Sequence, residues 1–334
     1  MRASNLLRQL NSSMGKTDKI RILITGAGTA SAVTVIKSLK SQNELEITTI
    51  AGDPDPMAPG LHLAEEKIIL PKLSSTGYIN DLLKICRDNK INVLIPAYSK
   101  ELSLISTNVR SLSNEGVRTL MHPIGSIDLC NNKLAFASFL QKRNILTPMT
   151  FNSNNIKEDP PNFPLFAKPN TGSSSTGTFK IDTEDELEAS LSKYPDKIYQ
   201  QFIDGEEYTI DVLSDTGGKP IVISPRQRLS TKAGQSVKAV TVEDYAMNEI
   251  VKSICQEIRF NGPLNVQVIK NGNKYYLIEI NPRFAAGGLG LTIAAGANIP
   301  LLAVKLILGL PISENECVVK SGVKMTRYWQ EIIF

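Results

Sequence analysis

The feature that most constrains the fold is an alternation of strand and helix patterns over the first third of the chain. Short apolar runs at 20–28, 45–53 and 91–98 have the composition of buried strands. Between them, residues 30–41 and 78–90 carry apolar side chains at helical spacing. This alternation predicts a parallel sheet with helices on both of its faces.

A proline-rich stretch at 158–166, EDPPNFPLF, marks a boundary after which the pattern changes. Strands are predicted at 164–168 and 197–203, with a helix at 183–193 between them, which together form a small β-rich unit. Antiparallel strands follow, beginning with 206–214. The order of elements therefore predicts an α/β domain with a parallel sheet, and then an α+β domain that carries a small inserted lid.

The composition argues against several classes of partner. The chain has 334 residues, enough for two or three domains, and its 42% apolar and 21% charged residues are ordinary for a soluble protein. The net charge of +4 comes with no basic block, so no nucleic-acid partner is expected. The longest apolar stretch, 299–311, is interrupted by Lys305 and is shorter than the about 20 residues that span a bilayer, so no membrane partner is expected.

Histidine and cysteine are scarce. Two histidines leave almost no material for a histidine-based zinc site or a Ser-His-Asp triad. The four scattered cysteines are interpreted as reduced thiols of a cytoplasmic protein. Residues 1–18 are expected to be a disordered leader.

A glycine turn at 25–32, TGAGTASA, follows the first strand and opens a helix. Together with Asp53 at the end of the second strand, it approaches a dinucleotide-binding fingerprint. Ser31 stands where the third glycine belongs, however. An NAD-dependent oxidoreductase built on this turn therefore stays as an alternative function, and a strand–turn–helix with another task is the favoured interpretation.

A second glycine-containing loop lies at 167–179, AKPNTGSSSTGTF. Gly172 and Gly177 have P-loop spacing, but Thr178 and Phe179 replace the required Lys-Ser/Thr, so this is no Walker A loop. Lys168 at a strand end, followed by small hydroxyl residues, could cover phosphates. A flexible surface loop explains the same composition equally well.

Polar residues interrupt the last two predicted strands at alternate positions. Asn265 and Gln267 share one face of their strand, and Glu279 and Asn281 share one face of the next. A carboxylate with amide oxygens on one face suits Mg²⁺, which takes one or two protein carboxylates and completes its shell with phosphates and water. Arg283, one step further, can neutralise a phosphoryl group. The structural alternative, a Glu279–Arg283 pair, leaves the two buried amides unexplained.

Two predictions of local structure accompany this site. A three-residue hairpin loop at 271–273, which pairs Asn265 with Glu279, would bring all four polar side chains to one face, with Gly272 or Asn273 left-handed. A two-residue Asn-Gly turn would send Glu279 to the opposite face. A single helix is predicted over 127–144, with Ser126 as its N-cap.

Taken together, these segments resemble the ATP-grasp superfamily, and in particular proteins like the carbamoyl phosphate synthetase large subunit. The most specific segments are NVQ at 265–267, LIEINPRF at 277–284 and AAGANIP at 294–300. The resemblance covers the chain from about residue 19. It implies a pre-ATP-grasp α/β domain at 19–122 and an ATP-grasp domain at 123–334, with a mobile lid at about 163–203.

The resemblance also implies a set of site residues. Phosphate would be held by two lysines and a lid loop, adenine by the hinge backbone, ribose by an acid, and magnesium by one carboxylate and two amides. Arginines would contact the γ-phosphate and the substrate carboxylate or acyl phosphate. The phosphate-binding residues would be Lys133, Lys168, Ser173, Ser174 and Ser175, and the adenine and ribose would meet Gln201, Ile203 and Glu207. Magnesium would be held by Gln267, Glu279 and Asn281. Arg283 would contact the γ-phosphate, and Arg226 and Arg228 the substrate carboxylate or acyl phosphate.

The implied function is an ATP-dependent ligase that joins a carboxylate to an amine, or less often to another nucleophile, through an acyl phosphate, with Mg²⁺ or Mn²⁺ as the metal. The partners would be these small molecules, and the resemblance is compatible with a homodimer. Gly28, Thr29, Ser31 and Glu101 would line the acceptor wall, where Glu101 either receives an amino group or is a solvated helix-start acid. A non-catalytic nucleotide-binding regulator is the remaining alternative.

Overall fold

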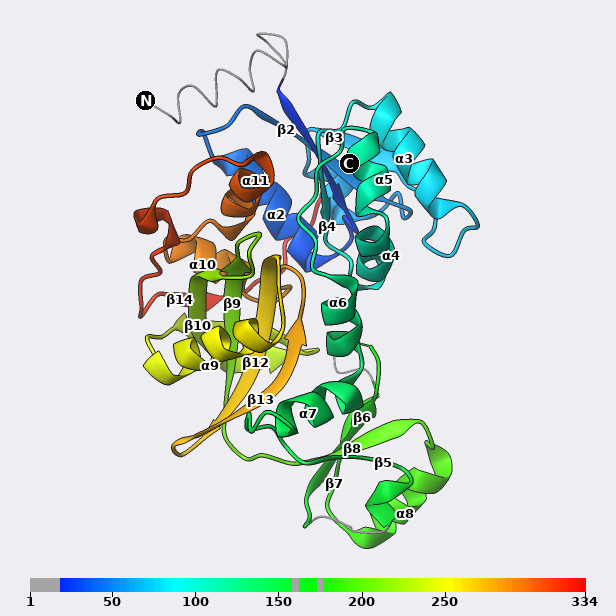
Figure 1. Ribbon diagram of the computed structural model, residues 1–334, viewed down its shortest axis with the longest axis vertical. Coiled ribbons are helices and arrows are strands. Elements are labelled where there is room, and N and C mark those ends of the chain that lie inside the picture. The colour runs from blue at the N-terminus through cyan, green and yellow to red at the C-terminus, as the bar shows by residue number, and fades with distance from the viewer. Residues whose placement is uncertain (1–18, 158–161, 173–176) are drawn as a thin grey trace.

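The computed structural model describes residues 19–157, 162–172 and 177–334. The predicted leader at 1–18, residues 158–161 of the proline-rich stretch, and Ser173, Ser174 and Ser175 lie outside the described residues. Three sheets follow one another along the long axis of the molecule (Figure 1). Within the described part of the chain, no helix has the length and apolar character that crossing a membrane requires.

The first sheet is parallel, as predicted. Its strand order is β3-β2-β1-β4, and each neighbouring pair runs in the same direction. The strands are β1 (Ile20–Thr25), β2 (Ile47–Asp53), β3 (Glu66–Ile69) and β4 (Val93–Pro96). The short strand β3 was not predicted, because half of its four residues, EKII, are charged. Its side chains are mostly exposed.

Helices cover both faces of this sheet, which confirms the predicted layering. Along β1, Ile22 and Ile24 enter one apolar cluster, while Leu23 between them enters another on the opposite face. The first cluster contains helix α2, and the second contains α3, α4 and α5. The bounds are α2 (Ala30–Ser41), η1 (Pro59–His62), α3 (Tyr78–Asp88), η2 (Ser99–Glu101), α4 (Leu102–Thr107) and α5 (Val109–Asn114).

A six-stranded antiparallel sheet forms the middle of the molecule. Its order is β13-β12-β9-β10-β11-β14. The strands are β9 (Glu206–Ser214), β10 (Pro220–Lys232), β11 (Gln235–Thr241), β12 (Gly262–Asn271), β13 (Lys274–Asn281) and β14 (Lys324–Thr326). The helical elements between and after these strands are α9 (Tyr245–Glu257), α10 (Leu289–Ala294), α11 (Ile299–Leu308) and η4 (Glu314–Cys317).

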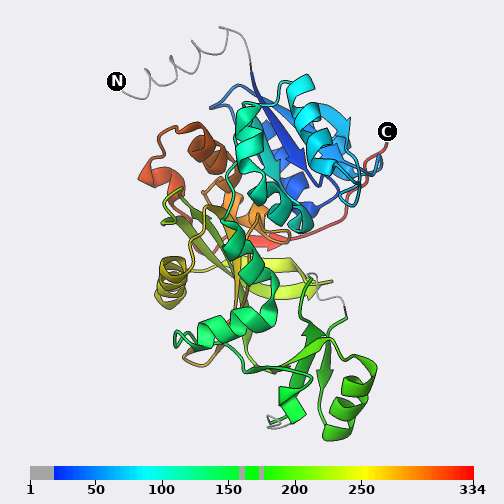
Figure 2. The same ribbon diagram turned by 45° about the vertical axis from the view of Figure 1, so that its right-hand side comes forward.

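The third sheet is small and antiparallel, and it lies at the far end of the molecule (Figure 2). Its order is β5-β8-β6-β7, with the helix α8 (Glu184–Lys193) capped by the Thr183 side chain. The remaining elements of this unit are β5 (Thr150–Asn152), η3 (Asn155–Lys157), β6 (Leu165–Pro169), β7 (Phe179–Ile181) and β8 (Lys197–Gln201). Strand β5 lies before residue 163, where the predicted lid begins, so the small sheet extends beyond the predicted bounds of the lid.

The predicted helix at 127–144 is wrong in detail, because two helices occupy this region. These are α6 (Ile124–Asn131) and α7 (Lys133–Gln141). Asn132 separates them: its side chain accepts from the backbone N–H of Ala135 and caps α7, which is the kind of local bond that draws asparagine out of helix interiors. Ser126 lies inside α6 and donates instead to the carbonyl of Arg259.

The predicted three-residue hairpin loop is also wrong, whereas the predicted left-handed Gly272 is confirmed, and Gln267 and Glu279 still lie opposite each other. Asn271 pairs with Lys274, so the loop has two residues, Gly272 and Asn273, with Gly272 in the left-handed region at φ 56°. A β-bulge at Ile278 then shifts the register by one residue, so that Gln267 pairs with Glu279. Asn265 correspondingly pairs with Asn281 rather than with Glu279.

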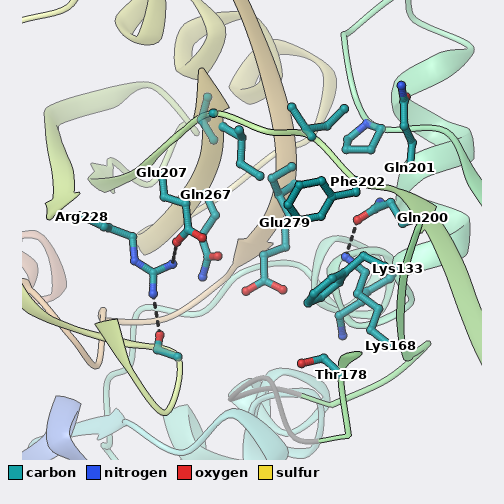
Figure 3. A pocket seen from close by; sticks show the side chains of 18 of the residues that line it. Lys133, Lys168, Thr178, Gln200, Gln201, Phe202, Glu207, Arg228, Gln267 and Glu279 are labelled. Carbon is teal, nitrogen blue, oxygen red and sulfur yellow. Dashed lines mark hydrogen bonds and ion pairs between the residues drawn. The ribbon is translucent and has the colours of Figure 1, made fainter. Parts of the chain in front are cut away.

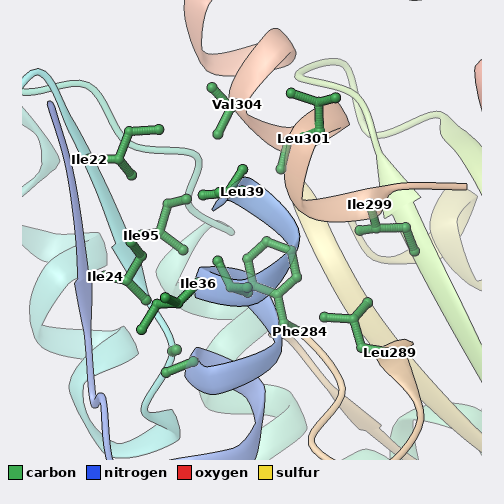
Figure 4. Close-up of a cluster of buried hydrophobic side chains, with 14 of the residues drawn as sticks. Ile22, Ile24, Ile36, Leu39, Ile95, Phe284, Leu289, Ile299, Leu301 and Val304 are labelled. Carbon is green, nitrogen blue, oxygen red and sulfur yellow. The ribbon is translucent and has the colours of Figure 1, made fainter. Parts of the chain in front are cut away.

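A continuous apolar core joins the parallel sheet to the last part of the chain (Figure 4). Phe284, which follows β13, lies in one cluster with Ile24 and Ile36 of the parallel-sheet unit and with Leu301 and Val304 of α11. Polar contacts accompany this core. The Ser38 hydroxyl donates to the Asn298 side chain at 2.6 Å, and Lys305 forms ion pairs with Glu44 and Glu316.

Candidate active site

A cavity of about 640 Å³ lies between the small sheet and the six-stranded sheet (Figure 3). Its walls come from β6 and β8 on one side, from β9, β10, β12 and β13 on the other, and from the segment that connects β8 to β9. Eight of the predicted site residues that the structure describes line it. They are Lys133, Lys168, Gln201, Ile203, Glu207, Arg228, Gln267 and Glu279.

Gln267 and Glu279 face the cavity together. They are direct cross-strand partners in β12 and β13, and both line the cavity. The bulge at Ile278 is responsible, because it places both Ile278 and Glu279 among the lining residues. The structure therefore brings the predicted carboxylate and one predicted amide to one surface.

Asn281 and Arg283 lie behind Glu279, outside the lining of the cavity. The Asn281 amide donates to Glu279 Oε1 at 2.9 Å, and its oxygen accepts from Arg283 Nη2 at 3.3 Å. The Arg283 Nε donates to the Ser99 hydroxyl at 2.6 Å. Burial lowers the pKa of Arg283, and the charge of Glu279 opposes that effect. A hydrogen-bonded chain thus runs from the cavity carboxylate to Ser99, at the end of β4.

The two predicted phosphate-binding lysines approach the cavity from different elements. Lys168 lies on β6 and donates to Gln200 Oε1 at 2.7 Å, and Lys133 opens α7 and donates to the carbonyl of Gly172 at 2.7 Å. Burial lowers the pKa of Lys168 to about 8, against the opposing effect of Glu279. Burial also lowers the pKa of Lys133. An anion in the cavity would therefore stabilise the charged form of both lysine side chains.

Arg228 and Glu207 form the opposite edge of the cavity. The guanidinium Nη1 lies 3.0 Å from Glu207 Oε2, and Nη2 donates to the carbonyl of Gly234 at 2.9 Å. The Nε of Arg228 is buried and has no hydrogen-bond partner among the described residues. Burial lowers the pKa of this guanidinium, while Glu207 opposes the effect. A buried donor without a partner is costly to the folded chain.

Arg226 has a different place from the predicted one. Its side chain is 2% exposed and pairs with Asp211, with Nε–Oδ2 at 3.2 Å and Nη2–Oδ1 at 3.3 Å. Asn265 and Thr292 also donate to Asp211. A Cβ added to Gly288 would lie 2.1 Å from the Arg226 guanidinium carbon, so the backbone packs directly on it. Arg226 and Asn265 therefore belong to a buried polar network beneath the site.

The predicted hinge strand forms the wall between the two sheets. Gln201 and Ile203 both line the cavity, but the N–H of Gln201 already donates to the carbonyl of Met149 at 2.8 Å. The N–H of Phe202 donates to Pro164 at 3.2 Å. Further along, Gly205 approaches β12 closely. The segment 203–205 thus connects the two walls of the cavity.

The glycine turn is filled by the protein itself. The N–H of Gly28 donates to Asp53 Oδ2 at 2.8 Å, so the acid expected to meet a ribose occupies the anion position of the turn. A Cβ at Gly26 would lie 2.7 Å from the Cβ of Tyr98, which leaves no room above the turn. Ser31 donates to the carbonyl of Ala97. These contacts argue against a dinucleotide site.

Glu101 is a buried group, so the interpretation as a solvated helix-start acid is wrong, and its proposed contact with an amino group stays a prediction. Its side chain accepts from Thr25 Oγ1 at 2.5 Å, from the Tyr98 N–H at 3.2 Å and from the Tyr78 hydroxyl at 3.3 Å. It is 3% exposed, which excludes a solvated acid. Burial raises the pKa of Glu101 to about 7, although these three hydrogen bonds lower it. Thr29 caps α2 and is not among the residues that line the cavity.

Sequence reasoning missed several residues that line the cavity. Phe166, Phe202 and Ile278 supply apolar surface, Tyr208 an aromatic ring, and Gln200 the partner of Lys168. Gln200 carries no clear signal, because β8 has the sequence KIYQQ, in which Lys197 and Gln201 are polar as well. Ile278 carries none, because only the bulge turns it toward the cavity.

The arrangement suits an anionic ligand that also carries an apolar group. The lining combines apolar and aromatic residues with the positive charge of Lys133, Lys168 and Arg228. Within the described residues, no group of three or more His, Cys, Asp or Glu side chains could hold a metal alone. One carboxylate with amide oxygens fits Mg²⁺ whose remaining ligands are phosphate oxygens and water.

Family models match two parts of this chain. A family model described as "ATP-grasp in the biosynthetic pathway with Ter operon" matches residues 193–330, and one described as "PylC-like, N-terminal domain" matches residues 22–120. The carbamoyl phosphate synthase large chain of Thermotoga neapolitana is 23% identical over 258 residues, a match that covers 71% of this chain and 23% of that protein. The chain spans less than a third of the length of the curated relatives it matches first.

Solved structures share the fold. N5-carboxyaminoimidazole synthetase from Staphylococcus aureus, complexed with ADP, has a TM-score of 0.70 at 16% identity and covers 88% of this chain and 78% of its own. An L-amino acid ligase from Bacillus licheniformis has a TM-score of 0.66 at 17% identity and covers 91% of this chain and 78% of its own. The chain therefore shares the fold of these structures, and its two parts match a PylC-like N-terminal model and an ATP-grasp model.

Proposed function

We propose that this protein is an ATP-dependent ligase that joins a carboxylate to an amine, or to a related nucleophile, and releases ADP and phosphate. The observation that carries the proposal is the cavity itself. It combines two lysines, an arginine and a carboxylate–amide pair between two antiparallel sheets, and it is large enough for a nucleotide. The S. aureus structure with the same fold contains ADP.

In this proposal, the nucleotide lies along the cavity. The adenine would rest on the apolar side near Phe166, Phe202 and Ile278, beside the backbone of Ile203. Glu207 would accept hydrogen bonds from the ribose hydroxyls. Lys133 and Lys168 would hold the phosphates, because both are cationic groups that burial has deprived of solvent. The predicted serine loop would cover them.

Magnesium would be held by Glu279 and Gln267, with Asn281 orienting the carboxylate through its 2.9 Å hydrogen bond. When bound, it would neutralise phosphate charge and align the γ-phosphate for transfer. Mn²⁺ is an expected substitute because it takes the same oxygen ligands. Asn281 turns its own oxygen toward Arg283, so its proposed part is to support Glu279.

The chemistry proposed for this site needs no covalent protein nucleophile. A substrate carboxylate oxygen attacks the γ-phosphorus, the bond to the bridging oxygen breaks, and ADP leaves. The amine nitrogen then attacks the acyl carbon, phosphate departs, and the amine proton passes to solvent. Phosphoryl transfer of this kind depends on positioning and charge neutralisation, which Lys168, Arg228 and Arg283 would provide.

A screen tests the proposal. The protein is mixed with Mg·ATP and panels of acids and amines, phosphate release is measured, and products are identified by mass spectrometry. Glu279→Gln should lower turnover by about 10²–10³-fold, because removal of a single transition-state contact has this effect elsewhere. Arg283→Ala should do the same.

Glu243→Gln is the matched control, since Glu243 is exposed and does not line the cavity. It should behave as the wild type does. Nucleotide binding without phosphate release for any acid–amine pair would favour the non-catalytic regulator. Full turnover in Glu279→Gln would overturn the proposed role of that carboxylate.

A further inference from the structure

Arg283 is the group of the proposed site that is held from outside the ATP-grasp domain. Among the described residues, its side chain donates three hydrogen bonds, to Asn281 Oδ1, to the carbonyl of Phe284 and to the Ser99 hydroxyl. The Ser99 contact is the shortest, at 2.6 Å, and it joins residues 184 positions apart in sequence. The other two partners are near neighbours of Arg283 along the chain.

Ser99 itself is fixed by the end of the parallel sheet. It begins η2, two residues beyond the end of β4 at Pro96, and Glu101 closes this short helix by accepting from the Tyr98 N–H. The Glu101 carboxylate is anchored in turn by Thr25 at the end of β1 and by Tyr78 of α3. The ends of β1 and β4 therefore determine where the Ser99 hydroxyl stands, at the sheet edge where open parallel sheets present ligand contacts.

The backbone that carries Arg283 is anchored to the same domain. Phe284 is 4% exposed and is packed in the core that contains Ile24 and Ile36 (Figure 4). The side chain of Arg283 and the backbone that carries it are thus both fixed against the parallel-sheet unit. A surface hydrogen bond alone would not give this rigidity.

We propose that Ser99 is a positioning residue for Arg283, and that the N-terminal domain thereby completes the phosphate-binding end of the site. The inference rests on the proposed function. Ser99 would not touch the substrate. It orients the guanidinium, with Glu101 holding Ser99 in place, so that Arg283 and Asn281 present a fixed arrangement to Glu279 and to the γ-phosphate.

The test compares two nucleotides by titration calorimetry on the full chain. One is Mg·ADP, and the other is the magnesium complex of the non-hydrolysable β,γ-imido analogue of ATP. Ser99→Ala should weaken binding of the analogue about tenfold and leave Mg·ADP binding within about twofold, because only the γ-phosphate would reach Arg283. Arg283→Lys should show the same selective loss.

Two further variants distinguish the positioning role of Ser99 from a general disturbance of the fold. Ser99→Thr retains the hydroxyl and should restore binding of the analogue. Ser103→Ala removes a serine hydroxyl of similar burial that bonds to Asp128 rather than to Arg283, and it should leave both nucleotides unaffected. The thermal unfolding midpoint of Ser99→Ala should stay close to that of the wild type.

The outcomes separate the two proposals. If Arg283→Lys loses the analogue selectively and Ser99→Ala does not, Arg283 keeps its role and the positioning inference is overturned. Equal weakening of both nucleotides by Ser99→Ala, or failure of Ser99→Thr to restore binding, also overturns it. If the wild-type chain binds neither nucleotide, the proposed function fails first and this inference falls with it.

Discussion

At the scale of single residues, the sequence revealed polar groups that interrupt buried strands. Gln267 and Glu279 were predictable because polar atoms at alternate positions of an apolar strand need a partner or a ligand. Arg226 was not, because its partner Asp211 lies on the neighbouring strand β9 and becomes visible only once the strand register is known. The burial of Glu101 was not predictable for a similar reason: its three hydrogen-bond donors come from β1, α3 and its own turn.

His122 gives a residue-scale prediction about pH and stability. Its Nε2 meets the carbonyl of Pro263 at 3.0 Å, and its Nδ1 accepts from the Asn261 N–H at 3.1 Å, so the buried ring is held neutral. Burial lowers the pKa of His122 from 6.5 to about 4, against the opposing effect of the Pro263 bond. The unfolded chain therefore binds the extra proton first as the pH falls. This contribution to stability is complete above about pH 6.5 and is lost as the pH falls toward 4.

Urea unfolding of the wild type and of His122→Gln at pH 7.5 and pH 5.0 measures this contribution. The stability advantage of the wild type should shrink by ~2 kcal/mol at the lower pH, since one pH unit is worth about 1.4 kcal/mol for a single proton. Glu101, whose pKa is raised, changes stability with pH in the opposite direction. Both proteins contain Glu101, so its contribution cancels in the comparison. Parallel pH profiles for the two proteins would contradict the prediction.

At the scale of elements, helices with clear apolar spacing and caps were predicted well, and short polar strands were not. The bounds of α2 agree with the predicted 30–41. Strands β3, β5 and β14 escaped because each has only three or four residues and little apolar character. The bulge at Ile278 could not be foreseen, because it is set by the pairing of β12 with both of its neighbours and not by a local turn signal.

Gly205 gives an element-scale prediction about the wall between the sheets. A Cβ there would lie 2.3 Å from the carbonyl oxygen of Lys270, so Gly205→Ala must push the connecting segment away from β12. We expect a loss of stability of ~1–3 kcal/mol, as for other overpacked sites, together with weaker Mg·ADP binding. Chemical denaturation and calorimetry measure the two effects.

The matched control is Gly125→Ala. Gly125 lies within α6, where an added Cβ would meet no atom within 4 Å beyond its chain neighbours and the nearby helix backbone, and the variant should gain up to ~1 kcal/mol from helix propensity. Nucleotide binding should not change in this variant. If Gly205→Ala binds Mg·ADP as tightly as the wild type, the connecting segment does not shape the cavity as we infer.

At the scale of the whole molecule, the sequence predicted the kinds of sheet and their order but not how the units are joined. Strand and helix patterns are local, whereas the shared core is made by residues that are far apart along the chain, such as Ile24 and Phe284. The boundary at 122/123 therefore stays a proposal about domains. In the structure, the chain returns after β13 to pack α11 and Phe284 against the parallel-sheet unit (Figure 4).

This shared core leads to a prediction about cooperativity. Phe284→Ala removes a large side chain that is 4% exposed, and it should cost ~3–5 kcal/mol. Because the cluster spans both units, the loss should lower hydrogen-exchange protection in β1 and β4 as well as in α11. The small sheet has its own cluster around Leu165, Leu187 and Tyr199, so its protection should not change. Leu187→Ala should show the reverse pattern, and loss of protection confined to residues near Phe284 would mean that the two units are stabilised independently.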